Sequence, residues 1–147
     1  MKTAILYYTF GGATKAEAER LSKELGASLY RVYEKHNRSF LGSFIPGCPH
    51  AMKRKASKIK SIGVDLSAFD RIVIGCPIWA GYPAPAFNAI VGLLPEGKDV
   101  ELFFCSGGGE QQDEAGSIAL AETRGCKVTA CRELRTEKKP SKLKGER

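Results

Sequence analysis

The sequence predicts an α/β fold with a doubly wound parallel sheet that carries helices on both faces. Short apolar runs alternate with segments of helical periodicity, which is typical of strand–helix–strand units. Glycine- or proline-rich loops follow three of the apolar runs. Right-handed crossovers place such loops together at the carboxyl edge of the sheet. The expected strand order is 2-1-3-4-5, in which strands one and three flank the point where ligands bind.

Five segments have the composition of strands. Residues 4–8 and 71–76 are apolar runs of the kind found in strands that are buried on both faces. Residues 28–33 alternate between apolar and polar side chains, which indicates a half-buried strand near a sheet edge. Residues 99–105 and 127–134 complete the five-stranded sheet.

Helical periodicity appears between these strands. Residues 13–25 place apolar side chains on one face, and Gly26 follows them as a stop signal. Residues 86–94 begin after a proline, which is favoured in the first turn of a helix. Residues 110–124 are a further patterned helix, and residues 51–60 are expected to form a short basic helix.

Size and composition indicate one soluble domain. The 147 residues are enough to bury a full core. No apolar run reaches membrane-spanning length and the N-terminus has no signal-peptide layout, so we expect a cytoplasmic protein without membrane contact. The domain is expected to cover residues 1–134, followed by a basic tail over residues 135–147.

The five cysteines are expected to be free thiols, because their number is odd and no Cys-x-x-Cys pair occurs. The two histidines lack the spacing of a zinc site, so no metal site is expected. Cys76 and Cys105 end strands close to the predicted loops. We interpret them as small buried hydrophobic side chains rather than as redox partners of a ligand.

The net charge of +7 is concentrated in residues 53–60 and in the tail from Arg135. Such clusters form docking surfaces for acidic partners or nucleic acid, or merely a solvated helix and a disordered tail. Few aromatic residues lie among the lysines, so we do not expect nucleic-acid binding.

The first loop joins a buried strand to the start of a helix. Backbone N–H groups at such a junction, together with the helix dipole, suit a phosphate, although two glycines also suit a simple tight turn. The loop lacks both the Walker A ending and the Gly-x-Gly-x-x-Gly pattern. The candidate binding residues are Thr9, Phe10, Gly11, Gly12, Ala13 and Thr14.

The other two loops offer a flat surface. The second, over residues 77–85, carries the only tryptophan among prolines, and the third is rich in glycine. A phosphate site at one end and an aromatic stacking face at the other describe flavin mononucleotide (FMN). The candidate FMN-binding residues in these loops are Pro77, Ile78, Trp79, Ala80, Gly81, Ser106, Gly107, Gly108 and Gly109.

These motifs resemble those of the flavodoxin-like family, specifically its small single-domain members. Residues 9–14 stand where that family has its Ser/Thr-x-Thr-Gly-x-Thr phosphate loop, residues 69–85 resemble its third strand and aromatic loop, and residues 104–109 resemble its third flavin-contacting loop. The likeness covers about residues 1–134. It implies a flavodoxin-like fold and non-covalently bound FMN, with Tyr82 or an aromatic residue of positions 40–45 beside Trp79.

The sequence departs from the family pattern in three ways. Gly11 and Ala13 replace polar residues of the phosphate loop, and the chain is basic where electron-carrier flavodoxins are acidic. No helical periodicity follows residues 127–134, so the last helix of the family is expected to be missing, which would leave an apolar sheet face bare beside residues 13–25. A homodimer that covers this face is therefore expected, and a monomeric mass by light scattering would contradict it.

Three functions are compatible with this sequence. The first is an FMN-binding redox protein that carries electrons to or from a protein partner, which a basic face would select as acidic. The second is an FMN-dependent NAD(P)H:quinone-type oxidoreductase, although no nicotinamide motif is visible. The third is a flavin-free interaction domain, which only Gly11 and Ala13 support. No catalytic side chain is expected, because the flavin itself supplies the chemistry.

Overall fold

A six-stranded sheet forms the centre of the computed structural model, which describes residues 1–36, 47–107 and 110–136. The strands are β1 (Thr3–Tyr7), β2 (Ser28–Arg31), β3 (Arg71–Trp79), β4 (Tyr82–Pro83), β5 (Asp99–Ser106) and β6 (Lys127–Arg135). Five of them pair in parallel in the order β2-β1-β3-β5-β6, and β4 pairs antiparallel with β3 alone. The predicted order 2-1-3-4-5 is confirmed once the short strand β4 is set aside.

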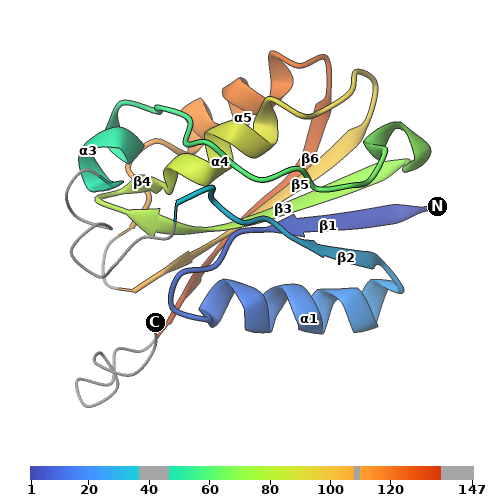
Figure 1. Cartoon of the computed structure of the whole chain (residues 1–147), viewed down its shortest axis with the longest axis horizontal. Helices are drawn as coiled ribbons and strands as arrows, with labels where there is room; N and C mark the ends of the chain where they lie inside the picture. The colour runs from blue at the N-terminus through green and yellow to red at the C-terminus, as the bar shows by residue number, and fades with distance from the viewer. Residues whose placement is uncertain (37–46, 108–109, 137–147) are drawn as a thin grey trace.

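Helices cover both faces of the sheet (Figure 1). They are α1 (Ala13–Leu25), α3 (Gly47–Met52), α4 (Pro85–Val91) and α5 (Glu114–Glu122), with a 3₁₀ turn η1 at Leu66–Ala68. In the view of Figure 1, α1 lies below the sheet, whereas α3, α4 and α5 lie above it. The predicted doubly wound architecture is therefore confirmed.

Two hydrophobic clusters hold these layers together. Alternate residues of one strand enter different clusters, because successive side chains of a strand point to opposite faces. Ile72 and Ile74 pack with Phe87 of α4, while Val73 between them packs with Leu21 of α1 and Phe103 of β5. The apolar composition of the central strands follows from this burial on both faces.

The predicted basic helix over residues 51–60 was wrong. α3 ends at Met52, and Arg54 has a φ of 51°, in the left-handed region that an α-helix of L-residues cannot use. Residues 58–60 instead run antiparallel to residues 33–35, joined by an isolated bridge between Glu34 and Ile59. Extended pairing has therefore replaced helix formation in the second half of this segment.

The predicted bare apolar face beside α1 is not found among the described residues. Arg71 and Glu101 lie on this side of the sheet, 3.8 Å apart, and Arg132 of β6 bonds to Glu17 of α1. These charged side chains interrupt the face on which the homodimer prediction rests. Self-association remains a prediction, and the expected absence of a last helix falls on residues 137–147, outside the described residues.

No helix in the described part of the chain is both long and apolar enough to cross a membrane.

Gly75 of β3 is in close contact with the ring of Phe103 on the α1 side of the sheet. A Cβ atom there would overlap the ring of Phe103, which is 1% exposed. Gly75→Ala should lower the free energy of unfolding by about 1–3 kcal/mol because of overpacking, measured by urea denaturation. Phe103→Leu in the same chain should recover part of that loss, and strictly additive effects would contradict the explanation.

Glu17 should make stability depend on pH. Its carboxylate accepts two bonds of 2.8 Å from Arg20 and one of 3.3 Å from Arg132. The bonds from Arg20, and then those from Arg132, hold the pKa of Glu17 below its usual value of 4.5. Because the folded-state pKa is lowered, this stabilisation is present above pH 4.5 and is lost as the pH falls through the folded-state pKa.

Glu17→Gln should lower the urea midpoint at pH 7 and flatten the loss of stability in acid. Glu24→Gln is the matched control, because Glu24 bonds to the same arginine from an exposed position. Equal effects of the two substitutions would show that the buried carboxylate of Glu17 contributes no more than the exposed one of Glu24.

Candidate functional site

The three predicted loops leave neighbouring strands at the carboxyl edge of the sheet. β3 lies between β1 and β5, so the loops after these strands are adjacent. Two contacts join them directly. Phe10 of the first loop touches Trp79 at the end of β3, and the backbone N–H of Gln112 donates to the carbonyl of Gly81 at 2.6 Å. We call residues 9–14, 77–81 and 106–107 the loop cluster.

The first loop is shaped by its own backbone. Gly12 has a φ of 100° and is the N-cap of α1, and its N–H donates to the hydroxyl of Thr9 at 3.0 Å. No side chain caps α1, its first turn contains no acidic residue, and the space around a Cβ at Gly12 is open. The backbone N–H groups at an uncapped helix start, together with the positive end of the helix dipole, suit an anion.

Thr14 does not contribute to the mouth of this loop. It is 2% exposed, and it lies near the thiol of Cys105. Burial raises the pKa of Cys105, and the Thr14 side chain opposes part of that rise. Thr9 is also buried, whereas Gly11, Gly12 and Ala13 are exposed.

The second loop contains a β-hairpin, where the sequence predicted a loop over residues 77–85. β3 continues to Trp79, Ala80 and Gly81 turn with φ values of 52° and 87°, and Trp79 pairs with Tyr82 of β4. Two successive positive φ values are typical of the tight turns of hairpins. Pro77 is tolerated inside β3 because β1 ends at Tyr7 and leaves no ladder partner at that level.

Trp79 lies beside the first loop and is half-buried. Its indole makes edge-on contacts with the rings of Phe10 and Tyr8. The ring centroids of Trp79 and Phe10 are 5.7 Å apart and their planes meet at 87°. For Trp79 and Tyr8 the distance is 6.1 Å and the angle 79°. Perpendicular aromatic contacts of this kind are attractive beyond the area that they bury. The predicted juxtaposition of the phosphate loop and the tryptophan is therefore present in the structure.

Tyr8 and Glu34 anchor this aromatic contact, and the sequence analysis did not identify them. The Tyr8 hydroxyl donates to Oε1 of Glu34 at 2.8 Å, and both residues are 6% exposed. A hydrogen bond to a buried carboxylate fixes the tilt of the tyrosine ring, and that ring in turn packs against Trp79. The only sequence signal was the alternation of residues 31–35, which places Glu34 inward.

The third loop is tied to β6 and to the hairpin. The side chain of Ser106 is buried and donates to Glu133 at 3.3 Å, so its hydroxyl points toward β6. The N–H of Gln111 donates to the other oxygen of Glu133 at 2.9 Å. Gly107 is exposed, whereas Gly108 and Gly109 lie outside the described residues, as do the aromatic residues of positions 40–45.

Arg54 is a second anchor that the sequence analysis missed. Its guanidinium donates to Ser117 at 3.0 Å and to the carbonyl of Asp113 at 2.9 Å, and it lies over the ring of Tyr82 at 5.4 Å. Asp113 also caps α5. One arginine thus connects the segment after α3, the hairpin and the start of α5, so this member of the basic cluster is occupied internally.

The thiols near the loops do not form a redox pair. Cys76 belongs to the cluster on the α4 side and Cys105 to the cluster on the α1 side, so the sheet separates them. Burial raises the pKa of Cys76, which keeps this thiol neutral. Within residues 1–36, 47–107 and 110–136, no group of three His, Cys, Asp or Glu side chains is placed to hold a metal.

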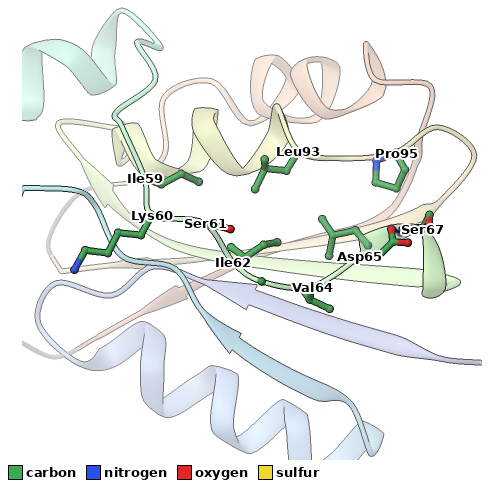
Figure 2. Close-up of a pocket in the computed structure, with 11 residues that line it drawn as sticks. Ile59, Lys60, Ser61, Ile62, Val64, Asp65, Ser67, Leu93 and Pro95 are labelled. Atoms are coloured by element: carbon green, nitrogen blue, oxygen red, sulfur yellow. Dashed lines mark hydrogen bonds between the residues drawn. The ribbon is translucent and has the colours of Figure 1, made fainter.

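A cavity of about 550 Å³ lies away from the loop cluster, between the segment that leads into β3 and the end of α4 (Figure 2). Residues 59–67 line it together with Leu93 and Pro95. Leu66 comes shortly before β3 and Pro95 shortly before β5, so this end of the cavity is at the amino ends of the strands. None of the predicted site residues lines it.

Several solved structures with a similar fold are flavoproteins or flavodoxins. A flavoprotein in complex with FMN from Lactobacillus acidophilus NCFM aligns with a TM-score of 0.72 and 23% identity over 99% of this chain and 97% of that one. A putative flavoprotein from Bacteroides uniformis ATCC 8492 aligns with a TM-score of 0.79 and 19% identity over 95% and 94%. Two-electron reduced Megasphaera elsdenii flavodoxin aligns with a TM-score of 0.55 and 19% identity over 90% and 85%.

These likenesses establish that the chain has the flavodoxin-like α/β fold, which confirms the predicted fold class. Neither a protein-family model nor a curated protein sequence matches the chain.

Tyr8→Phe tests the anchoring of Trp79. The substitution removes the bond to the Glu34 carboxylate and should cost about 1.5–3 kcal/mol of stability, while the indole gains freedom. Because Trp79 is the only tryptophan, the loss appears directly as a weaker near-ultraviolet circular dichroism band and lower fluorescence anisotropy.

Tyr30→Phe is the matched control, because the ring of Tyr30 packs edge-on against Phe69. An unchanged tryptophan signal in Tyr8→Phe would contradict the anchoring role.

Proposed function

We propose that this chain is an FMN-binding flavoprotein that carries electrons to or from a protein partner. The observation that carries the proposal is the contact between Phe10 and Trp79, which brings an anion-binding loop and an aromatic surface together at the carboxyl edge of the sheet. The flavodoxin-like fold supports the same ligand, because a similar structure is described as a complex with FMN. The site for FMN is the loop cluster.

The phosphate end fits the first loop. The uncapped start of α1 offers N–H donors, Gly12 leaves open space, and Lys15 in the first turn adds positive charge. The missing hydroxyl at Gly11 costs on the order of 1–2 kcal/mol of binding, and Ala13 replaces a residue that is commonly polar. We therefore expect binding that is real but weaker than a loop with the full set of hydroxyls would give.

The ring end fits the hairpin. Trp79 is half-buried and fixed in orientation by two perpendicular neighbours, so little conformational freedom is lost when a flat ligand packs on it. Ala80 and Gly81, next in the chain, carry little side-chain bulk at the tip of the turn. The third loop approaches from β5 and is held against the hairpin by the bond from Gln112 to Gly81.

The chain's own residues have a limited role in the chemistry. When bound, FMN supplies the capacity to accept and release electrons. The first loop holds the phosphate, the hairpin orients the ring, and the anchored tryptophan excludes water from one side of it. No acid, base or nucleophile is required of the protein, which agrees with the neutral, buried thiols of Cys76 and Cys105.

An NAD(P)H:quinone-type oxidoreductase remains the alternative function. It makes a different prediction in solution, because such an enzyme takes hydride from the nicotinamide without a second protein. NAD(P)H alone should leave the absorbance of the bound flavin unchanged if the chain is an electron carrier, and rapid bleaching would favour the enzyme.

Comparison of FMN with riboflavin tests whether both ends of the site hold the same ligand. Riboflavin lacks the phosphate and should bind at least about a hundredfold more weakly than FMN, because charge-assisted bonds to the first loop are lost. Trp79→Ala should weaken both ligands by roughly tenfold, because it removes only the stacking surface. Calorimetric titration measures both effects.

Equal affinity for FMN and riboflavin would contradict a phosphate site in the first loop. A protein that retains no flavin colour after desalting with excess FMN would favour the flavin-free interaction domain.

A further inference from the structure

A strip of positive charge lies on two paired extended segments, residues 31–35 at the end of β2 and residues 58–60. It consists of Arg31, Tyr33, Lys35, Lys58 and Lys60, and all five residues are exposed. We call it the basic strip. The residues between them, Val32, Glu34 and Ile59, are buried or half-buried. The alternation is that of paired extended chains, in which successive side chains point to opposite faces.

Backbone bonds fix the geometry of the strip. The N–H of Lys35 donates to the carbonyl of Lys58 at 2.8 Å, and the N–H of Lys60 donates to the carbonyl of Tyr33 at 2.8 Å. Glu34 and Ile59 form the antiparallel bridge between these bonds. Lys35 therefore lies across from Lys58, and Tyr33 lies across from Lys60, on the outer face.

This arrangement is unfavourable for the isolated protein. Like charges directly opposite one another across paired extended segments destabilise the pairing. Among the described residues, no carboxylate forms an ion pair with Lys35 or Lys58. Glu34, which lies next to Lys35 in sequence, points inward to the hydroxyl of Tyr8. The strip is thus concentrated charge that an external anionic surface would neutralise.

An exposed aromatic residue sits inside the strip. Tyr33 is 47% exposed, with the Arg31 guanidinium 4.8 Å and the Lys60 ammonium 5.8 Å from its ring centroid. Tyrosine and arginine together are enriched at the energetic centres of protein interfaces. Single-stranded nucleic acid needs open aromatic faces for base stacking, and a ring flanked by two cations is a poor platform for it.

The inner side of the basic strip is connected to the loop cluster through Glu34 and Tyr8. Its inward residue Glu34 bonds to Tyr8 at 2.8 Å, and Tyr8 packs against Trp79 at 6.1 Å. Two side chains, those of Glu34 and Tyr8, would therefore separate a partner docked on the strip from Trp79 of the loop cluster.

The geometry points to the basic strip as the docking surface for a carboxylate-rich face of a partner protein. The inference rests on the proposed function in one respect, since it identifies the partner as the one that exchanges electrons at the loop cluster. Charge attraction would steer the two proteins together, and Tyr33 would supply the contact that remains at high salt.

The test uses a decaglutamate peptide as the acidic probe and an oligothymidylate of equal charge as the nucleic-acid probe, on the full-length chain with and without FMN. Lys58→Glu should weaken peptide binding roughly tenfold, since a repulsion replaces an attraction. It should also raise the melting temperature, because it relieves the repulsion with Lys35. Weaker binding by a more stable protein cannot result from unfolding.

Two further variants complete the design. Lys23→Glu makes the same charge change at an exposed position of α1 and should weaken peptide binding less than about twofold. Tyr33→Ala keeps the net charge and should weaken the binding that persists at high salt.

Equal weakening by Lys23→Glu and Lys58→Glu, or tighter binding of the oligothymidylate than of the peptide, would overturn the assignment. The test of the basic strip is independent of the test of the proposed function, because peptide binding is measured without FMN as well as with it. Absence of flavin binding would remove the proposed function and leave the strip, whereas absence of peptide binding by the FMN-loaded protein would remove only the strip.

Discussion

The edge-on contact of Phe10 with Trp79, at 5.7 Å between ring centroids, joins two parts of the chain that are distant in sequence. Phe10 belongs to the loop before α1, and Trp79 is the last residue of the central strand β3. The contact depends on the parallel pairing of β1 with β3, which brings both carboxyl ends to one edge. It also depends on the bond between Tyr8 and Glu34. If either support were absent, an anion-binding turn and an aromatic surface would remain, but they would not form one site.

The sequence was sufficient for the layers of the fold because burial on both faces imposes a composition that is visible in residues 71–76. It did not predict that β3 continues to Trp79, because proline normally ends a ladder. Pro77 is accommodated because the pairing of β1 with β3 ends at Tyr7 and Gly75. This register is set by the folded sheet and is not visible in the sequence. The basic helix failed for a similar reason, since the left-handed conformation of Arg54 and its partners on α5 depend on tertiary structure.

The candidate site shows the same division. Gly12 and Trp79 were identified from local signals, a glycine before a helix and a single tryptophan between prolines. Tyr8 and Glu34 were missed because their bond links residues 26 positions apart, and alternation reveals which side chains point inward but not what they meet. Thr14 was expected to face a ligand and instead lies under the loop against Cys105, because the first turn of α1 packs on β5.

The central claim is that the loop before α1 and the indole at the end of β3 grip one flavin. Titration of the flavin-free protein with FMN while tryptophan emission is followed tests it most directly, because Trp79 is the only tryptophan. The account predicts strong quenching that saturates at one FMN per chain. Flavin that binds without any change in the emission of Trp79, or no binding at all, would contradict it.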